Sequence, residues 1–385
     1  MAVRTVQRKP NLKKRNPKIK PNQYDFMVLF VVVMLVLFGV VMIFSSSYYY
    51  TLTRASFHYD MYYFLKRQTI WASMGFIAML FFMNFNYKIL KNFSFLAYLF
   101  SNFCLVLVQL VGTRINGQKR WLGITDAIGF QPSEVAKISI ILFLAFYIST
   151  HKNCLDDLKG FFRCLFILAI PTALIAISNF STAIVVAAIG GTIIFIASPK
   201  IWYFVVGAIP VGIGSVVAVS LPQFAYRFSR IKIWRDPFSD PTGKGYQTIQ
   251  SLYAIASGGL FGLGLGQSRQ KTFIPESYND IIFAIICEEL GMVGAALVIL
   301  LFAVLIWRGI KIALNSVDMF GCLVAIGIVA MIGFQAIINI AVVTNTIPNT
   351  GQPLPFISYG GTSLLFTMSS MGILLNISKY QKTRD

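Results

Sequence analysis

The sequence predicts an all-α polytopic membrane protein with about ten transmembrane helices. Hydrophobic residues make up 56% of the 385 residues, charged residues make up only 12%, and the mean hydropathy is +0.70. Soluble domains carry about 25% charged residues, so this composition places most of the chain in lipid. Apolar runs of about 20 residues, the length that crosses a bilayer as a helix, recur along the chain.

Ten runs fit membrane spans: 26–46, 69–85, 93–112, 133–149, 162–178, 181–197, 201–220, 281–306, 319–344 and 359–377. An even number of spans puts both termini on one side of the membrane. Residues 1–24 carry eight basic residues and no acidic residue, so the positive-inside rule predicts that this side is cytoplasmic. We interpret residues 1–24 as a disordered basic tail attracted to anionic lipid, and residues 25–385 as a single membrane domain.

Between spans seven and eight, residues 222–280 form a segment rich in Arg, Lys, Asp, Gly and Pro. Under this topology the segment is a large extracytoplasmic loop, and its polarity predicts that it handles a polar substrate. The stretch GYQTIQSLYAIASGG inside it predicts a short amphipathic helix that ends at Gly258-Gly259. The expected apolar side of this helix holds Tyr246, Ile249, Leu252 or Tyr253, and Ala256.

Several chemistries are excluded by residue counts. The two histidines, His58 and His151, fall on opposite sides of the membrane, so a histidine metal site or a Ser-His-Asp triad is not expected. The five cysteines lie in spans or on the cytoplasmic side, so no disulfide is expected in the outer loops. We expect no cofactor and no nucleic-acid binding, and a divalent-cation requirement stays open.

Three carboxylates fall at membrane depth: Glu134, Glu288 and Glu289. A charge at this depth is costly unless it is paired or hydrated, so each one is a candidate functional residue. In GFQPSEVAKIS, Lys137 lies three residues after Glu134, on the same helix face. The pair is either an internal ion pair near a helix start, with Pro132 in the first turn and Ser133 as cap, or part of a polar substrate cavity. The other two acids predict interhelical hydrogen bonds, with a polar pocket as the alternative.

Asp280 stands at the outer N-terminus of the eighth predicted span, where the helix dipole favours an ionised carboxylate. Taken alone, it is a helix cap. The same segment is crowded with basic residues: Arg227, Arg230, Lys232, Arg235, Lys244, Arg269 and Lys271. Such residues either bind a pyrophosphate and stabilise its departure, or attract lipid headgroups. One carboxylate base facing fixed cations indicates a glycosyl-transfer site.

A second irregular segment, TIPNTGQPLPFISYGG at residues 346–361, has three prolines and three glycines between apolar spans. Irregular backbone at membrane depth is tolerated only where it contacts protein or water. We therefore expect this segment to form a cavity wall.

At these residues the sequence resembles the SEDS family of bacterial membrane proteins, which includes FtsW, RodA and SpoVE. The matching stretches, in order along the chain, are NGQKRWLG, FQPSEVAK, DPTGKGYQTIQSLYAIASGG, GLGLGQSRQK, PESYNDIIFAIICEELG and PNTGQPLPFISYGGTS. The resemblance implies a ten-span fold and a peptidoglycan glycosyltransferase that polymerises lipid II outside the cytoplasmic membrane with a class B penicillin-binding protein, the transpeptidase. Within the family, the resemblance is greatest to FtsW or SpoVE, on the basis of SSSYYY, the basic tail and PFISYGGTS. It therefore implies a role in division or sporulation. We expect other divisome proteins as partners and a location at the septum.

The resemblance also implies that Asp280 is the essential carboxylate. The candidates for substrate binding are motif residues together with Arg227 of the basic loop: Arg120, Glu134, Lys137, Arg227, Lys271, Glu276 and Ser358. The expected reaction is an inverting displacement, in which Asp280 deprotonates the GlcNAc 4-hydroxyl of an acceptor lipid II. That hydroxyl attacks the MurNAc anomeric carbon of the growing chain, and undecaprenyl pyrophosphate leaves. A hydrated carboxylate at a helix N-terminus is a weak base, so substrate or partner binding must desolvate it.

One stretch departs from the family pattern, because ISNFSTA at 177–183 stands where many members have QPDLGTA. A role for that acid is absent here or is met by Asn179. Two alternatives to a polymerase remain open. A lipid II flippase predicts ionisable residues along a path through the membrane and inverted repeats. A scaffold that recruits the penicillin-binding protein predicts that Asp280 is dispensable.

Overall fold

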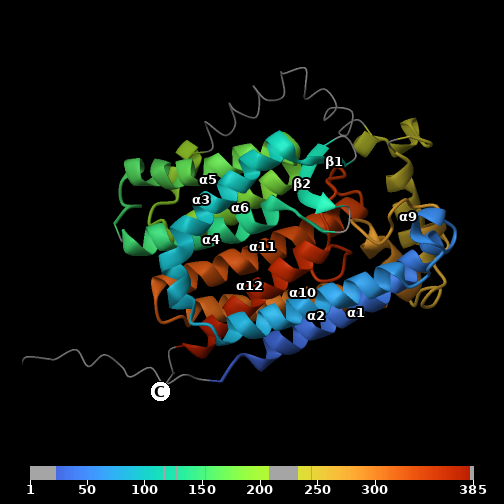
Figure 1. Cartoon of the computed structure of the whole chain (residues 1–385), viewed down its shortest axis with the longest axis horizontal. Helices are drawn as coiled ribbons and strands as arrows, with labels where there is room; N and C mark the ends of the chain where they lie inside the picture. Colours follow the sequence, from blue (N-terminus) through green and yellow to red (C-terminus); the bar gives the residue numbers. More distant parts are fainter. Residues whose placement is uncertain are drawn as a thin grey trace, which may run out of the picture.

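The computed structural model describes residues 23–115, 118–125, 128–151, 153–207, 233–243 and 245–381. Long helices run side by side through most of the molecule (Figure 1). Their bounds are α1 Phe26–Leu52, α2 Tyr63–Asn84, α3 Tyr87–Val111, α4 Pro132–Thr150, α5 Leu158–Ser178, α6 Phe180–Ala197, α9 Tyr246–Gly258, α10 Ile282–Leu314, α11 Met319–Val343 and α12 Gly361–Lys379. Three short 3₁₀ helices are η1 Ala55–Phe57, η3 Pro237–Ser239 and η4 Gln270–Thr272.

Within the described residues, eight helices are long and apolar enough to cross a membrane: α1, α3, α4, α5, α6, α10, α11 and α12. They coincide with predicted spans one, three to six, and eight to ten. α2 covers the second predicted span and has 22 residues, but polar residues at its start, including Lys66 and Arg67, lower its hydropathy. Most of the seventh predicted span, 201–220, and nearly all of the predicted tail lie outside the described residues. The polytopic helical fold is confirmed, and the count of ten stays a prediction.

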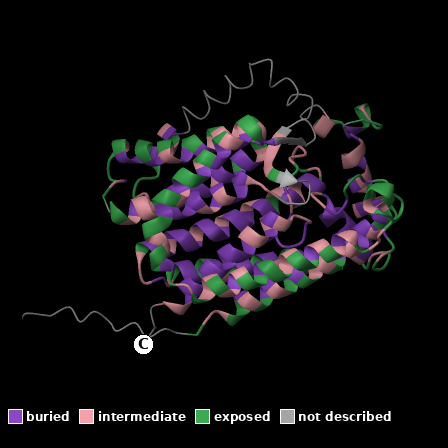
Figure 2. Cartoon of the chain, viewed as in Figure 1, coloured by how far each residue is buried: buried purple, intermediate pink, exposed green. Residues whose placement is uncertain are grey.

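The centre of the bundle is formed by α4, α11 and α12. Their apolar stretches are 72%, 67% and 78% buried, whereas those of α3 and α5 are 33% buried. Figure 2 shows the same contrast, with buried residues concentrated on the inner helices. α12 lies directly against α2, and a Cβ on Gly372 would come 2.4 Å from the Met79 carbonyl oxygen. The outward faces of α3 and α5 are apolar and exposed, as expected for helices in contact with lipid.

A small antiparallel sheet joins α3 to α4, and the sequence analysis missed it. Its strands are β1 Thr113–Ile115, β2 Gln118–Thr125 and β3 Ile128–Phe130, in the order β1-β2-β3. Arg114 pairs with Lys119, and Gly123 pairs with Gly129. The Asn-Gly dipeptide at 116–117 is a strong hairpin signal in the sequence. The all-α class therefore describes the membrane part and omits this sheet, which lies at the same end of the bundle as α9 (Figure 1).

The predicted amphipathic helix is confirmed as α9, but its predicted apolar side is wrong. Apart from Ile249, the buried residues are small ones: Ser251, Ala254 and Gly258. Tyr253 is 48% exposed. The reason is close packing against α10, since a Cβ on Gly258 would lie 1.9 Å from the Cys287 carbonyl oxygen. Because the two backbones approach closely, small side chains face α10. The spacing of apolar residues in the sequence does not indicate this face.

A break inside α10 explains the glycine-rich stretch at 262–266. Gly291 has φ 67° and ψ −166°, which interrupts the helix. The interruption leaves the carbonyls of Glu288 and Glu289 without their helical partners, and the N–H groups of Leu263 and Gly264 donate to them, each at 2.9 Å. Beyond the break, the N–H groups of Met292 and Val293 donate to loop carbonyls at 2.9 and 3.1 Å. The loop thus satisfies backbone groups that lipid could not.

Candidate functional site

Asp280 lies two residues before the first residue of α10, at the end of the bundle that carries α9 and the sheet. Its backbone carbonyl accepts a hydrogen bond of 2.7 Å from the Asn339 side chain of α11. The same Asn339 amide donates to the carbonyl of Gln352, also at 2.7 Å. Asn339 is fully buried, and it joins the start of α10 to the irregular segment that follows α11.

That irregular segment, 346–361, lies directly beside the Asp280 carboxylate. A Cβ on Gly351 would lie 3.6 Å from Oδ2 of Asp280, and Gly351 has φ +66°, a conformation that glycine adopts without strain. The side-chain oxygens Oδ1 of Asn339 and Oγ1 of Thr350 are buried and have no hydrogen-bond partner among the described residues. A partly buried carboxylate therefore stands next to a glycine whose missing side chain leaves room beside it.

Further backbone contacts fix this segment. The N–H of Leu354 donates to Oγ of Ser358 at 2.8 Å, so the Ser358 hydroxyl closes a turn inside the segment. The N–H of Tyr359 donates to the carbonyl of Tyr278 at 2.9 Å. The rings of Phe64, Tyr278 and Tyr359 pack together with centroids 4.1 to 5.8 Å apart. Burial raises the pKa of the Tyr278 hydroxyl, so it stays neutral beside the site.

Glu134 and Lys137 form a buried ion pair, with Oε1 and Nζ 2.9 Å apart. Ser363 of α12 donates to Oε2 of Glu134 at 3.1 Å. The helix start is confirmed at Pro132, but the predicted cap is wrong: Gln131 occupies the cap position, and Oγ of Ser133 has no partner among the described residues. The pair joins α4 to α12 in the centre of the bundle. An internal ion pair is confirmed, and a contact with substrate stays a prediction.

Lys271 is turned into the protein. Its residue exposure is 3%, and its Nζ lies 2.6 Å from the Gly266 carbonyl and 3.3 Å from Oε1 of Glu289. The ammonium also lies 4.5 Å from the ring centre of Tyr48 on α1. Its charge is therefore balanced internally, which favours holding the loop over meeting a pyrophosphate.

Glu288 and Glu289 are fully buried and organise the same loop. Glu288 accepts from the Ser268 hydroxyl and from the N–H groups of residues 269 and 270, at 3.0 Å for the shorter of these two backbone bonds. Glu289 accepts from the Ser45 hydroxyl of α1. The predicted interhelical hydrogen bonds are thus confirmed for both acids. Glu289 binds α1, and Glu288 accepts from the Ser257 hydroxyl of α9 at 3.4 Å in addition to its bonds with the loop. Together they hold residues 266–271 against α10 and α1.

The remaining candidates are dispersed. Nε of Arg120 on β2 donates to the Ser178 carbonyl at the end of α5, at 3.1 Å. Glu276 is exposed, has φ +52°, and accepts from the Asn279 side chain at 2.7 Å. Arg227 lies outside the described residues. Arg235 and Arg269 are exposed, and Trp234 next to Arg235 is held at the end of α11 by two hydrogen bonds with Asn345.

Asn179 takes over a structural role at the departure from the family pattern. Its Oδ1 accepts from the N–H of Thr182 at 3.2 Å and caps α6. The Thr182 hydroxyl in turn accepts from the Gln352 side chain at 2.9 Å. The start of α6 is thereby tied to the segment beside Asp280.

Asn339 is the residue that sequence reasoning missed. The signal was an uncharged amide side chain near the end of a predicted span, whereas the buried candidates were drawn from charged residues. Among the described residues, no three His, Cys, Asp or Glu side chains gather into a set that could hold a metal ion.

Comparison with known proteins identifies the family. The model described as "Cell cycle protein", which represents FtsW, RodA and SpoVE, matches residues 25–383. The chain belongs to this family. It is 41% identical over 369 residues to the stage V sporulation protein E of Bacillus subtilis (strain 168), covering 94% of this chain and 99% of that one. It is 37% identical to a probable peptidoglycan glycosyltransferase FtsW of Geobacter sp. (strain M18), covering 92% and 96%.

Solved structures agree with this membership. A chain from a peptidoglycan synthase complex that coordinates polymerization and crosslinking matches with a TM-score of 0.78 and 25% identity, covering 93% of this chain and 99% of that one. The rod shape determining protein RodA of Thermus thermophilus matches with a TM-score of 0.69 at 22% identity, covering 94% and 98%. The FtsW/RodA/SpoVE fold therefore extends over nearly the whole chain, which is a multi-pass membrane protein.

Proposed function

We propose that this protein is a peptidoglycan glycosyltransferase that polymerises lipid II at the outer face of the bacterial cytoplasmic membrane. The observation that carries the proposal is the placement of the Asp280 carboxylate beside Gly351, with its backbone held by Asn339. Relatives named as probable peptidoglycan glycosyltransferases support the reaction class. A fixed carboxylate next to an irregular, hydrogen-bonding segment suits the deprotonation of a sugar hydroxyl.

In the proposed reaction, Asp280 accepts the proton of the acceptor GlcNAc 4-hydroxyl. The oxygen forms a bond to the MurNAc anomeric carbon of the growing chain while the bond from that carbon to undecaprenyl pyrophosphate breaks, with inversion. The leaving group carries the negative charge away and needs cations near it. Because Lys271 is paired internally, the exposed Arg235 and Arg269 are candidates for this role among the described residues, and Arg227 stays a candidate outside them.

The decisive experiment is lipid II polymerisation by an Asp280→Asn variant purified with its transpeptidase partner. Loss of a general base lowers the rate by about 100-fold or more. Asp236→Asn serves as the matched control, because it removes the charge of an exposed carboxylate in the same predicted loop by the same substitution. Equal thermal stability of both variants shows that folding is intact. Glycan chains made by Asp280→Asn at the wild-type rate would refute the mechanism and favour the scaffold.

A flippase draws no specific support from the structure. Apart from those that the structure leaves undescribed, the buried charged side chains form two internally paired groups, Glu134 with Lys137 and the two acids of α10 with Lys271. A transport path needs ionisable groups spaced across the membrane. Reconstitution in liposomes with fluorescent lipid II separates flipping from polymerisation.

We further propose a class B penicillin-binding protein as partner, because the structural relative comes from a complex that couples polymerization to crosslinking. The relatives named FtsW and stage V sporulation protein E support a role at the division or sporulation septum, with other divisome proteins. A fluorescent fusion that labels the side wall evenly would contradict this location.

A further inference from the structure

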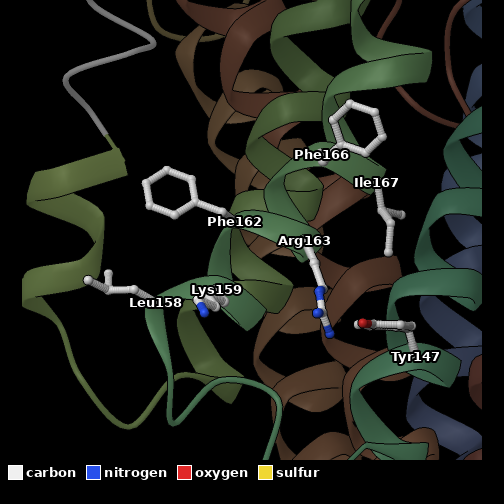
Figure 3. Close-up of a pocket in the computed structure, with 7 residues that line it drawn as sticks. All are labelled: Tyr147, Leu158, Lys159, Phe162, Arg163, Phe166 and Ile167. Carbon is white, nitrogen blue, oxygen red and sulfur yellow. The ribbon is translucent and has the colours of Figure 1, made fainter.

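A groove of about 620 Å³ lies between α4 and α5, at the end of the bundle where α1 begins and α12 ends. This is the end opposite to α9 and the sheet, so the groove is separate from the Asp280 site. Figure 3 shows its lining, with Tyr147 coming from α4 and the other labelled side chains from the first turns of α5. Nothing in the proposed polymerisation uses these residues.

The groove has a polar end and an apolar end. Lys159 and Arg163 stand one helical turn apart near the start of α5, and the Arg163 guanidinium points toward the Tyr147 hydroxyl (Figure 3). Further along α5, Phe166 and Ile167 line the apolar end. From residue 159 to residue 167 the helix rises about 12 Å, which spans the depth from a lipid headgroup to the first part of its acyl chains.

The exposure of the aromatic side chains indicates that the apolar end faces lipid. Phe166 is 67% exposed and Phe162 is 40% exposed. In a membrane helix such positions contact acyl chains, whereas basic side chains at the helix end reach the headgroup layer. The groove is therefore basic at one end and apolar at the other, in the same order as the headgroup and acyl chains of a phospholipid.

The two cations of the groove are available for an anionic group. The four ion pairs among the described residues involve other basic side chains, namely Lys66, Lys137, Lys271 and Arg308. Asp156 and Asp157 precede α5, are exposed, and do not line the groove. A phosphodiester between Lys159 and Arg163 would meet two positive charges and a tyrosine hydroxyl.

We infer that this groove binds one anionic glycerophospholipid, with its phosphodiester between Lys159 and Arg163 and its acyl chains along Phe162 and Phe166. Basic pockets between transmembrane helices on the cytoplasmic side are suited to such headgroups. Positive charge spread over the whole cytoplasmic face would attract anionic lipid without a defined site, so the test compares this pair of cations with another pair on the same face.

The experiment is a native mass spectrometry titration of the full-length protein in detergent with phosphatidylglycerol and, separately, phosphatidylcholine of the same acyl chains. Lys159→Gln/Arg163→Gln is expected to weaken binding of the first phosphatidylglycerol by about 10- to 30-fold and to leave phosphatidylcholine binding unchanged. The matched control is Lys88→Gln/Lys91→Gln, which removes two basic residues at the start of α3 that line no described groove. The control is expected to change phosphatidylglycerol binding by less than about 3-fold.

Equal loss in the two double variants would overturn the inference, because it would indicate diffuse attraction. Equal loss of both lipids in the groove variant would overturn it as well, since the cations would then not select the headgroup. If millimolar inorganic phosphate displaced phosphatidylglycerol as strongly as unlabelled lipid does, Lys159 and Arg163 would instead form a site for a free anion. Phe166→Ala is expected to weaken both lipids, and unchanged binding in that variant would contradict the acyl-chain contact.

Discussion

Replacing Asn339 tests whether this residue positions Asp280. In Asn339→Ala, the carbonyls of Asp280 and Gln352 each lose a hydrogen bond of 2.7 Å, which is partly buried for Asp280 and buried for Gln352. Each unsatisfied buried carbonyl costs about 1 to 3 kcal/mol, so the two losses together weaken the contacts between α10, α11 and the 346–361 segment by about 2 to 6 kcal/mol. Displacement of a reacting group by about 1 Å costs on the order of 100-fold in rate.

The assay is lipid II polymerisation at varied substrate concentration, together with thermal unfolding. Because Asn339 acts through the backbone of Asp280, kcat is expected to fall by about 10- to 100-fold while KM changes little. Gln335→Leu is the control, since Gln335 is buried one turn earlier on α11 and its Oε1 has no partner among the described residues. A wild-type kcat in a folded Asn339→Ala protein would refute the positioning role.

For three further substitutions the structure predicts the direction of the change in stability. Lys271→Met leaves the buried carboxylate of Glu289 without its cation, so the free energy of unfolding is expected to fall by about 3 to 5 kcal/mol in chemical unfolding. Adding Glu289→Gln is expected to recover part of the lost stability. No recovery would contradict the pairing. Gly262→Ala places a Cβ 2.2 Å from the Glu289 carbonyl oxygen at φ +79°, so the melting temperature is expected to fall, and an unchanged value would contradict the close contact. The hydrogen bond from Lys66 lowers the pKa of Asp60 below 3.8, so the stability it contributes is present above pH 3.8 and is lost as the pH falls through the lower folded-state value. Asp60→Asn is expected to remove that part of the acid dependence in pH-resolved unfolding, and an unchanged dependence would contradict it.

The polar segments lie together because the bundle brings one end of each of several helices to the same face. The sheet between α3 and α4, α9 and the start of α10 lie at the same end (Figure 1). This end combines irregular backbone with the Asp280 carboxylate. The proposed site therefore lies at one end of the bundle.

Most of the membrane architecture could be predicted because it depends on local sequence. A run of about 20 apolar residues is a span wherever it lies, and α10, α11 and α12 begin within two residues of the predicted spans. The same holds for α9, whose glycines end the helix as expected. The side on which α9 is buried was wrong, because α10 approaches so closely that small residues face it.

The sequence by itself determined that the chain spans a membrane and that one polar segment lies between two predicted spans. It also placed Asp280 at the start of the span that follows this segment. These properties follow from composition, helix length and the position of one carboxylate, which neighbouring residues suffice to define. Only the tertiary structure decided which polar groups are paired: Lys271 with Glu289, Asn339 with Asp280, and the loop glycines with the break at Gly291. Those partners are 18 to 59 residues apart in the chain, so their contacts depend on helix packing that no local pattern encodes.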